Sequence, residues 1–364
     1  MTGLVYLDAN ASQRLRPAAR AAMLAAFEVA GNPSSVHRAG RSVRRIMEDA
    51  RDVVAGGFGV RAQDVVFTSG GTEADATAIH ALGAGRRTII SAIEHDAVRS
   101  AAPGAVVLPV DGDGVADLTA LEARLGDGIA SLVCVMLANN ETGVTQPVRE
   151  AAVLCRRFGA LLHVDAVQAA GRMPVRLDEL GADSLAVSSH KVGGPAGVGA
   201  LLLAPEAPFL GALIGGGGQE RGRRGGTPAV ALMAGFAAAV AASAGDDLLR
   251  VARLRDAMEH AAVACGAVVC GDPERRLPNT TCLALPGAAA GVQVMALDLE
   301  GVAVSAGAAC SSGKVQTSHV LTAMGLGARA GEAIRVSLPW DVAEADVDAF
   351  AAAYRRMAGR LERG

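Results

Sequence analysis

Apolar residues recur along the first two thirds of the chain in short continuous runs rather than in alternation with polar residues. Continuous apolar strands indicate a sheet that is buried on both faces, and helical segments separate most of these runs. The pattern predicts an α/β fold with a mostly parallel central sheet. Its expected strands are residues 65–68, 88–92, 105–110, 130–137, 160–165, 183–188 and 199–203.

The pattern of predicted strands and helices changes near Gly245, which we take as a domain boundary. Before it, an Ala-rich apolar run at 229–242 is too short to span a bilayer and is expected to be a buried helix. After it, short strands and long helices predict a smaller α+β domain. Its expected elements are helices 247–265 and 342–361 and strands 267–270, 280–285, 302–304 and 334–338, and the first domain has further helices at 17–29, 41–56, 72–82 and 148–158.

Charge and cysteine content exclude several classes of function. The formal net charge of −3 gives no basic field for nucleic acid or a membrane surface. The N-terminus lacks the basic and apolar regions of a secretory signal. Six cysteines without a CxxC pair argue against a disulfide framework and against a metal site, so a cytoplasmic location is expected.

Lys191 is the first candidate for chemistry. It follows the apolar run 184–187, and Gly193, Gly194 and Pro195 then end the pattern. Lys191 and Lys314 are the only lysines in a chain that otherwise uses arginine. A lysine kept here supplies what arginine cannot, a primary amine that forms a Schiff base with a carbonyl cofactor. The alternative is a lysine on a loop with its ammonium in water.

Two further strand ends carry candidate residues. Residues 69–75 follow the first strand and open a helix, whose N-terminus can hold a phosphate, and Thr72 and Asp75 have the spacing of a capping box. An ordinary capped helix would explain the same stretch. His95 follows the second strand and can stack on an aromatic cofactor or move protons, although a surface or capping histidine is the alternative.

The strands that end near 137 and 165 also lead into polar residues. Asn139 and Asn140 precede a glycine turn and can grip a carboxylate or a cofactor oxygen, or can simply form the turn. Asp165 ends a buried strand with no basic residue close by in sequence. A cofactor cation, such as a protonated pyridine nitrogen, would keep this carboxylate ionised. The alternative is a helix N-cap.

Three stretches in the second half add anion-binding and nucleophilic groups. The Gly-rich basic loop 215–228 is either an anion loop or a linker, with Thr227 as expected N-cap of the next helix. Cys310 is the reactive group of the small-residue loop 305–313, whereas the other cysteines lie in predicted strands or helices. Arg335 lies inside an apolar strand, so it needs a substrate carboxylate or a structural ion pair.

Taken in order, these stretches closely resemble the cysteine desulfurases of the nitrogen-fixation and iron–sulfur-cluster type. These are class V, fold-type I pyridoxal-phosphate enzymes. The resemblance covers nearly the whole chain. The motifs that carry it are Gly-Gly-Thr-Glu-Ala-Asp (70–75), Glu-His (94–95), Asn-Asn-Glu-Thr-Gly (139–143), His-Val-Asp-Ala-Val-Gln (163–168), Ser-Ser-His-Lys (188–191), Gly-Gly-Gly-Gln-Glu-Arg (216–221) and Ser-Ala-Gly-Ala-Ala-Cys-Ser-Ser-Gly (305–313).

The resemblance implies a role for each candidate at the cofactor ring. Lys191 binds pyridoxal 5'-phosphate covalently and moves protons, and Asp165 pairs with its pyridinium nitrogen. His95 stacks on the ring and takes part in acid–base steps, and Gln168 hydrogen-bonds the ring oxygen. L-cysteine displaces Lys191 from the cofactor, and the Cys310 thiolate then attacks the substrate sulfur. The products are L-alanine and a persulfide on Cys310.

The resemblance also implies phosphate, substrate and partner contacts. Thr72, Ser188 and His190 hold the phosphate together with the backbone of Gly71, and Thr227 reaches the phosphate of the partner subunit in a homodimer. Asn140, placed at the cofactor, also binds the substrate carboxylate with Arg335, and Asn32 lines the entrance. No resident metal is implied, although Cys310 would meet a nascent iron–sulfur cluster on a scaffold protein.

The implied domains are a large cofactor-binding α/β domain at 12–245 and a small α+β domain at 1–11 and 246–364. The small domain carries the Cys310 loop and Arg335. A selenocysteine lyase and a class V aminotransferase are the alternatives, and an aminotransferase would not need Cys310. A non-catalytic scaffold would be expected to lack Lys191 or Asp165, and both are present. The sulfur acceptor stays open.

Overall fold

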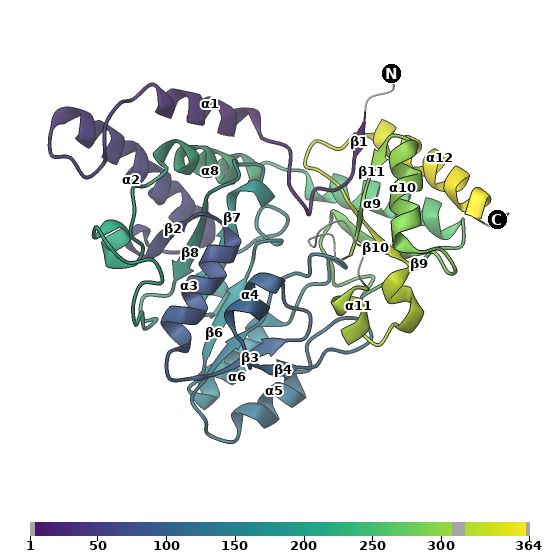
Figure 1. Ribbon diagram of the computed structural model, residues 1–364, viewed down its shortest axis with the longest axis horizontal. Coiled ribbons are helices and arrows are strands. Elements are labelled where there is room, and N and C mark those ends of the chain that lie inside the picture. Colours follow the sequence, from purple (N-terminus) through teal and green to yellow (C-terminus); the bar gives the residue numbers. More distant parts are fainter. Residues whose placement is uncertain (1–3, 308–316, 362–364) are drawn as a thin grey trace.

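The computed structural model describes residues 4–307 and 317–361, and its largest layer is a seven-stranded sheet (Figure 1). The strand order is β2-β8-β7-β6-β5-β3-β4. Strands β4, β3, β5, β6 and β7 run parallel, and β8 is antiparallel to both of its neighbours. The predicted α/β fold with a mostly parallel sheet is therefore confirmed. The strands are β2 (Val65–Thr68), β3 (Arg87–Ser91), β4 (Val106–Leu108), β5 (Ser131–Cys134), β6 (Leu161–Asp165), β7 (Ser184–Ser188) and β8 (Gly199–Leu203).

Helices cover both faces of this sheet, which explains its continuous apolar strands. In β5, Leu132 and Cys134 pack in one core with α3 and α4, while Val133 packs in the opposite core with α2, α5, α6 and α8. The central strands therefore bury both of their faces, whereas the edge strand β4 exposes Val107. The helices are α1 (Pro17–Phe27), α2 (Arg38–Phe58), α3 (Gly71–Gly83), α4 (Asp96–Ala101), α5 (Leu118–Leu125), α6 (Val148–Phe158), α7 (Leu177–Leu180) and α8 (Val230–Ser243).

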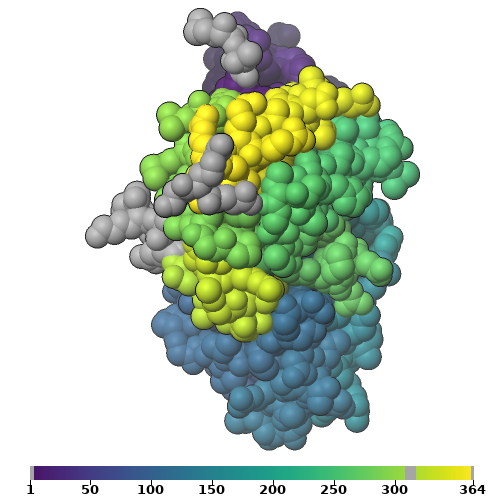
Figure 2. All heavy atoms as spheres, turned by 90° about the vertical axis from the view of Figure 1, so that its right-hand side faces the viewer, coloured from purple at the N-terminus to yellow at the C-terminus, as the bar shows by residue number. Residues whose placement is uncertain are grey.

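The C-terminal part is built on a four-stranded antiparallel sheet with the order β12-β13-β10-β9. The N-terminal strand β1 joins this part, because it pairs with β11, and Leu7 packs in the same core as Phe350 and Tyr354. Figure 2 shows α12 beside the segments around residues 250–300. The elements are β1 (Val5–Tyr6), β9 (Val268–Val269), β10 (Thr280–Ala284), β11 (Val302–Ala303), β12 (Ser305–Ala306), β13 (Ala333–Ser337), α9 (Leu248–Val263), α10 (Ala290–Leu299), α11 (His319–Ala323) and α12 (Glu344–Leu361). The division at 12–245 stays a prediction.

Helix α8 is the predicted Ala-rich buried helix, but it begins later than expected. Its N-cap is Ala229, so Thr227 does not cap it and Pro228 lies outside its first turn. In the part of the chain that the structure describes, no single helix is both long and apolar enough to cross a membrane. Helices α8 and α9 satisfy that test only as a pair, and a bend of 82° separates them.

Candidate active site

A cavity of about 270 Å³ lies at the carboxyl edge of the large sheet. It forms there because loops from neighbouring parallel strands meet at that edge. These loops bring together side chains that are far apart in sequence. Nine predicted site residues line the cavity: Gly71, Thr72, His95, Asn140, Asp165, Gln168, Ser188, His190 and Lys191.

Lys191 lies in a 3₁₀ turn (Ser189–Lys191) directly after β7, and its side chain is half-buried. Its Nζ donates hydrogen bonds to the carbonyl oxygens of Asn10 and Ala11, the latter at 3.0 Å. The segment that follows β1 therefore passes over the lysine and bounds the cavity. This placement differs from a lysine that extends into solvent from a loop.

Asp165 ends β6 and is only 6 % exposed. No helix follows it, so the alternative of an N-cap is wrong. Its Oδ1 instead accepts the backbone N–H of Val167 at 2.9 Å. Burial, and then the neighbouring Asp75, raise the pKa of Asp165 to about 7. A cation placed beside this carboxylate would offset its desolvation and keep it ionised.

The first turn of α3 faces the same cavity. A Cβ on Gly71 would lie 2.6 Å from a methyl group of Val167, so only glycine fits there. The predicted capping box of Thr72 and Asp75 is wrong, because the helix begins one residue earlier, at Gly71. The N-cap is Gly70, which has no side chain, and Glu73 accepts the backbone N–H of Ser69, which precedes the helix, at 2.8 Å. The free N–H groups of this turn can bind an anion.

His190 and Ser188 flank this anion-binding turn from the end of β7. The Nδ1 of His190 lies 3.3 Å from the Ser12 hydroxyl. Burial, followed by the positive charges of Lys191 and Arg172, lowers the pKa of His190 to about 4. His190 is therefore a neutral hydrogen-bonding group at physiological pH.

His95 caps a helix and also lines the cavity, and its role toward a cofactor stays a prediction. Its Nδ1 accepts the backbone N–H of Ala97 at 3.1 Å and so caps α4. The same imidazole lines the cavity. Gln168 is held at the cavity by its Nε2, which donates to the carbonyl of Asn10 at 3.0 Å, and by Arg172, which donates to its Oε1.

Arg335 lies on β13, beside the cavity rather than on its lining. It is 5 % exposed and donates to Asp8 Oδ1 at 2.6 Å and to the carbonyl of Asn140 at 3.1 Å. The structural ion pair that the sequence left open is therefore present. The contact with Asn140 places the guanidinium next to the cavity wall, and its role in substrate binding stays a prediction.

Two further predicted site residues do not line this cavity. Asn32 and Thr227 lie together on a separate cavity of about 430 Å³ between α1 and α8. Asn32 uses its side-chain oxygen to accept the N–H of Ser34. Cys310 lies outside the described residues.

Sequence reasoning missed three buried side chains next to the cavity. Asp75 lines it from α3 and hydrogen-bonds to His163. Glu94 is fully buried, accepts the N–H of Met136 at 2.7 Å, and has a pKa raised well above its ordinary value by burial and then by Asp165. Asp75, His163 and Glu94 each lie inside a motif quoted above. The sequence therefore showed where they stand in the chain, but not which residue each one contacts.

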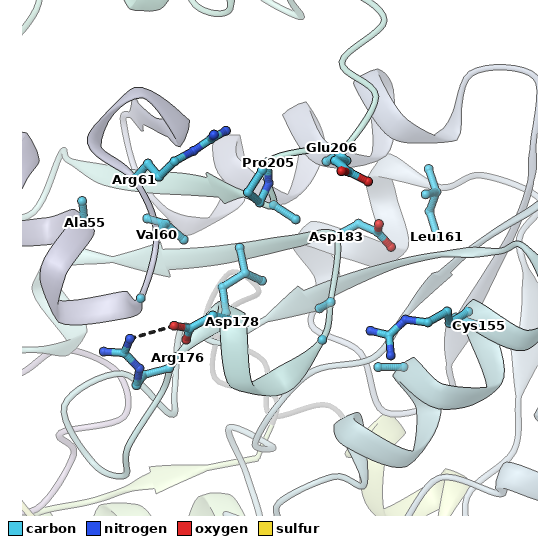
Figure 3. A pocket seen from close by; sticks show the side chains of 18 of the residues that line it. Ala55, Val60, Arg61, Cys155, Leu161, Arg176, Asp178, Asp183, Pro205 and Glu206 are labelled. Atoms are coloured by element: carbon cyan, nitrogen blue, oxygen red, sulfur yellow. Dashed lines mark hydrogen bonds and ion pairs between the residues drawn. The ribbon is translucent and has the colours of Figure 1, made fainter.

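A larger cavity of about 830 Å³ lies at the opposite edge of the sheet, where β6 begins (Figure 3). Leu161 and Asp183 line it together with the ends of α2 and α6. Arg176 donates to Asp178 across its rim at 2.7 Å (Figure 3). None of the predicted site residues lies there, so cavity size alone does not identify the site.

Comparisons with known proteins identify the family of the chain. The family model for class V aminotransferases matches residues 5–350. The chain belongs to the class V aminotransferase family. It is 45 % identical to a cysteine desulfurase from Cereibacter sphaeroides over 361 residues, which cover 94 % of this chain and 93 % of that protein.

Solved structures give the same result for the fold. A NifS-like protein from Rickettsia africae superimposes with a TM-score of 0.89 at 32 % identity, over 97 % of this chain and 99 % of that one. SspA, solved in complex with cysteine, gives 0.79 at 27 % identity, over 92 % and 98 %. The predicted family and the fold of a class V enzyme are confirmed.

Proposed function

We propose that this class V enzyme is a cysteine desulfurase that uses pyridoxal 5'-phosphate to remove sulfur from L-cysteine. The observation that carries the proposal is the cavity that gathers Lys191, Asp165 and His95 at adjoining strand ends. The proposal is also supported by relatives that match almost the whole chain and are named cysteine desulfurase. The structure of SspA with cysteine supports the same substrate.

The cavity fits pyridoxal phosphate in the chemistry of its donors. Asp165 is a buried carboxylate that lacks a cation and would pair with a protonated ring nitrogen. The first turn of α3, with Thr72, Ser188 and neutral His190, would hold the phosphate. Lys191 would supply the amine for the aldehyde carbon. When bound, this cofactor supplies an electron sink for charge that develops on the substrate Cα.

The residues of the chain would then position the substrate and move protons. Lys191 takes and returns the Cα proton, because its amine lies in the cavity at the end of β7. His95 is held by the N–H of Ala97 with its ring at the cavity, so Nε2 is the atom able to exchange a proton. Arg335 and Asn140 bind the substrate carboxylate. The ion pair between Asp8 and Arg335 weakens as that carboxylate arrives.

Cys310 is proposed as the nucleophile. Its thiolate attacks the sulfur of L-cysteine, an S–S bond forms, and the substrate Cβ–S bond breaks with its electron pair left on the carbon skeleton. The skeleton takes up protons and leaves as L-alanine, so that no external oxidant or reductant is needed. The persulfide on Cys310 can be unloaded by another thiol, which supplies sulfur to an acceptor or scaffold protein for iron–sulfur cluster assembly.

The active form is proposed to be a homodimer in a reducing cytoplasm. Thr227 does not line the smaller cavity of its own subunit. It lines the separate cavity that Asn32 also lines, where a second subunit would bring a phosphate within its reach. Exposed apolar side chains surround this region, including Leu24, Phe27 and Val36. The five described cysteines are free thiols, which suits a reducing compartment.

The test measures alanine, sulfide and keto acid released from L-cysteine by the protein loaded with pyridoxal phosphate. Cys310→Ala should abolish alanine and sulfide release but keep the visible absorption of the bound cofactor. Lys191→Ala should lose that absorption. Cys265→Ala, which changes a half-buried thiol in the C-terminal part, is the matched control and should behave as the wild type. A keto acid product that survives Cys310→Ala would favour an aminotransferase instead, and alanine release that survives it would remove Cys310 as the nucleophile.

A further inference from the structure

A hydrogen-bonded chain of three buried side chains runs beneath the cavity. His163 Nδ1 lies 2.8 Å from the Ser184 hydroxyl, and His163 Nε2 lies 3.1 Å from Asp75 Oδ1. The side chains of His163 and Asp75 are 0 % and 1 % exposed. Three different elements contribute to this chain: β7, β6 and α3. No step of the proposed reaction uses any of the three.

These hydrogen-bonded side chains are connected to the cavity through Asp75 and Asp165. His163 and Asp165 are two residues apart on β6, so their side chains point to the same face of the sheet. Asp75 and Asp165 both line the cavity. Two buried carboxyl groups that share one small cavity cannot both ionise without a large cost, so one of them keeps a proton.

The hydrogen bonds identify which carboxyl keeps the proton. Asp165 accepts a backbone N–H from Val167, and this favours its ionised form. Asp75 is bonded to His163, whose pKa burial lowers to about 4, so this imidazole is neutral and cannot neutralise a carboxylate. Burial raises the pKa of Asp75 well above its ordinary value.

Other titratable groups near Asp75 also favour its protonated form. Glu94, on the loop after β3, and Cys134, on β5, are fully buried, and burial raises the pKa of each. Neither a carboxyl nor a thiol can offer Asp75 a positive charge. His95 lies closer to Asp165, whose pKa it lowers. The cation of the cavity, Lys191, approaches from the end of β7 and bonds to the segment after β1.

We propose that Asp75 and His163 are a positioning pair that keeps the negative charge of the cavity on Asp165 alone. Asp75 remains a neutral acid and donates its proton to His163 Nε2. The imidazole carries its own proton on Nδ1 and donates it to the Ser184 hydroxyl. This inference rests on the proposed function only in its purpose, which is to leave Asp165 as the one anion available to the pyridinium nitrogen.

The opposite proton arrangement would have a different consequence. If Asp75 were ionised, His163 would donate from Nε2 and accept from Ser184, and the cavity would hold two negative charges. The second charge would repel the phosphate and would stabilise any cation in the cavity. The two arrangements therefore differ in the histidine tautomer and in the electrostatic field at Lys191.

The first experiment reads the tautomer directly in the cofactor-free protein. The chain has seven histidines, so ¹⁵N-histidine labelling gives few signals, and His163→Gln identifies the one from His163. We expect a proton on Nδ1 and none on Nε2 at pH 7.5. A proton on Nε2, or on both nitrogens, would overturn the proposal. This result does not depend on any catalytic activity.

The second experiment uses Asp75→Asn in the protein loaded with pyridoxal phosphate. The asparagine amide can donate to His163 Nε2 as the neutral acid does, so the pH midpoint of the visible absorption should move by less than about 0.3 unit. Loss of an ionised neighbour would instead lower that midpoint by about one unit or more, which would contradict the proposal. Asp75→Leu, which removes the donor, should weaken cofactor binding, and asparagine should restore it.

Failure of the proposed function would look different from failure of this pair. If the wild type takes up pyridoxal phosphate but releases no alanine, the desulfurase assignment fails while both readouts on Asp75 still apply. If the wild type takes up no cofactor, the tautomer measurement alone decides whether Asp75 is the protonated group.

Discussion

Replacement of Asp165 by asparagine should stabilise the cofactor-free protein while it abolishes cofactor function. The pKa of this carboxyl is about 7 in the folded protein, against 3.8 for an ordinary aspartate, and burial is the main cause. Asparagine keeps an oxygen that can accept the N–H of Val167, but it has no charge to desolvate. At any pH where Asp165 is ionised in the unfolded chain, its burial lowers the stability of the folded wild type. The substitution removes this loss of stability.

The sign and the pH range follow from this upward shift. Below pH 4 the carboxyl is protonated in both states, so wild type and Asp165→Asn should have similar stability. As the pH rises from 4 to 7, the unfolded wild type releases the proton and the folded one retains it, so the wild type loses stability. A shift of three units corresponds to about 4 kcal/mol. Because asparagine accepts the Val167 N–H more weakly than an ionised carboxylate does, we expect ~2 kcal/mol above pH 7.

Urea unfolding of both cofactor-free proteins between pH 4 and 8 measures this difference. The control is Asp52→Asn, which changes an exposed carboxylate on α2. Addition of pyridoxal phosphate should reverse the order, because the wild-type carboxylate then gains a cationic partner that asparagine cannot hold. A difference that is constant with pH, or a less stable Asp165→Asn protein at pH 8, would refute the reasoning.

Three further predictions concern stability and substrate binding. Glu220→Gln should lower the free energy of unfolding by about 2 kcal/mol in urea, because buried Arg51, paired with Glu220 at 2.7 and 2.8 Å, would keep only the more exposed Glu48 as a counter-ion; a loss below about 1 kcal/mol would contradict this. Phe236→Ala removes a fully buried ring on α8 and should cost about 4 kcal/mol by the same assay, whereas Leu299→Ala, at an exposed position on α10, should change little. Arg335→Gln should raise KM for L-cysteine at least tenfold with cofactor affinity unchanged, and an unchanged KM would remove Arg335 from the substrate site.

Much of the site could be predicted from sequence because of the geometry of parallel sheets. A polar residue that follows a continuous apolar run must lie at the carboxyl edge, whichever neighbours its strand has. Lys191, Asp165 and His95 each follow such a run, and they line one cavity. The rule needs no knowledge of strand order, and this is why it worked before the topology was known.

The pairings of the buried charges could not be predicted in the same way. Arg335 and Asp8 are 327 residues apart, and Arg51 and Glu220 are 169 apart, so no local pattern relates them. Asp75 was assigned to a capping box on its spacing from Thr72. The helix instead begins at Gly71, which turns Asp75 toward the sheet and His163. Local rules identify which residues are polar, and tertiary packing decides which partner each one meets.

The charges around the cavity explain why such pairings matter for binding. Asp75, Glu94 and Asp165 are buried carboxyls whose pKa values are all raised, so burial opposes negative charge at this cavity when no ligand is bound. A ligand that presents a cation to Asp165 and an anion to the first turn of α3 would add a charged partner to each of these two groups. Its binding energy would appear as stability of the fold, because the unfolded chain offers neither group in this arrangement. The strand ends thus form a site that favours a ligand with both charges over one that carries either charge alone.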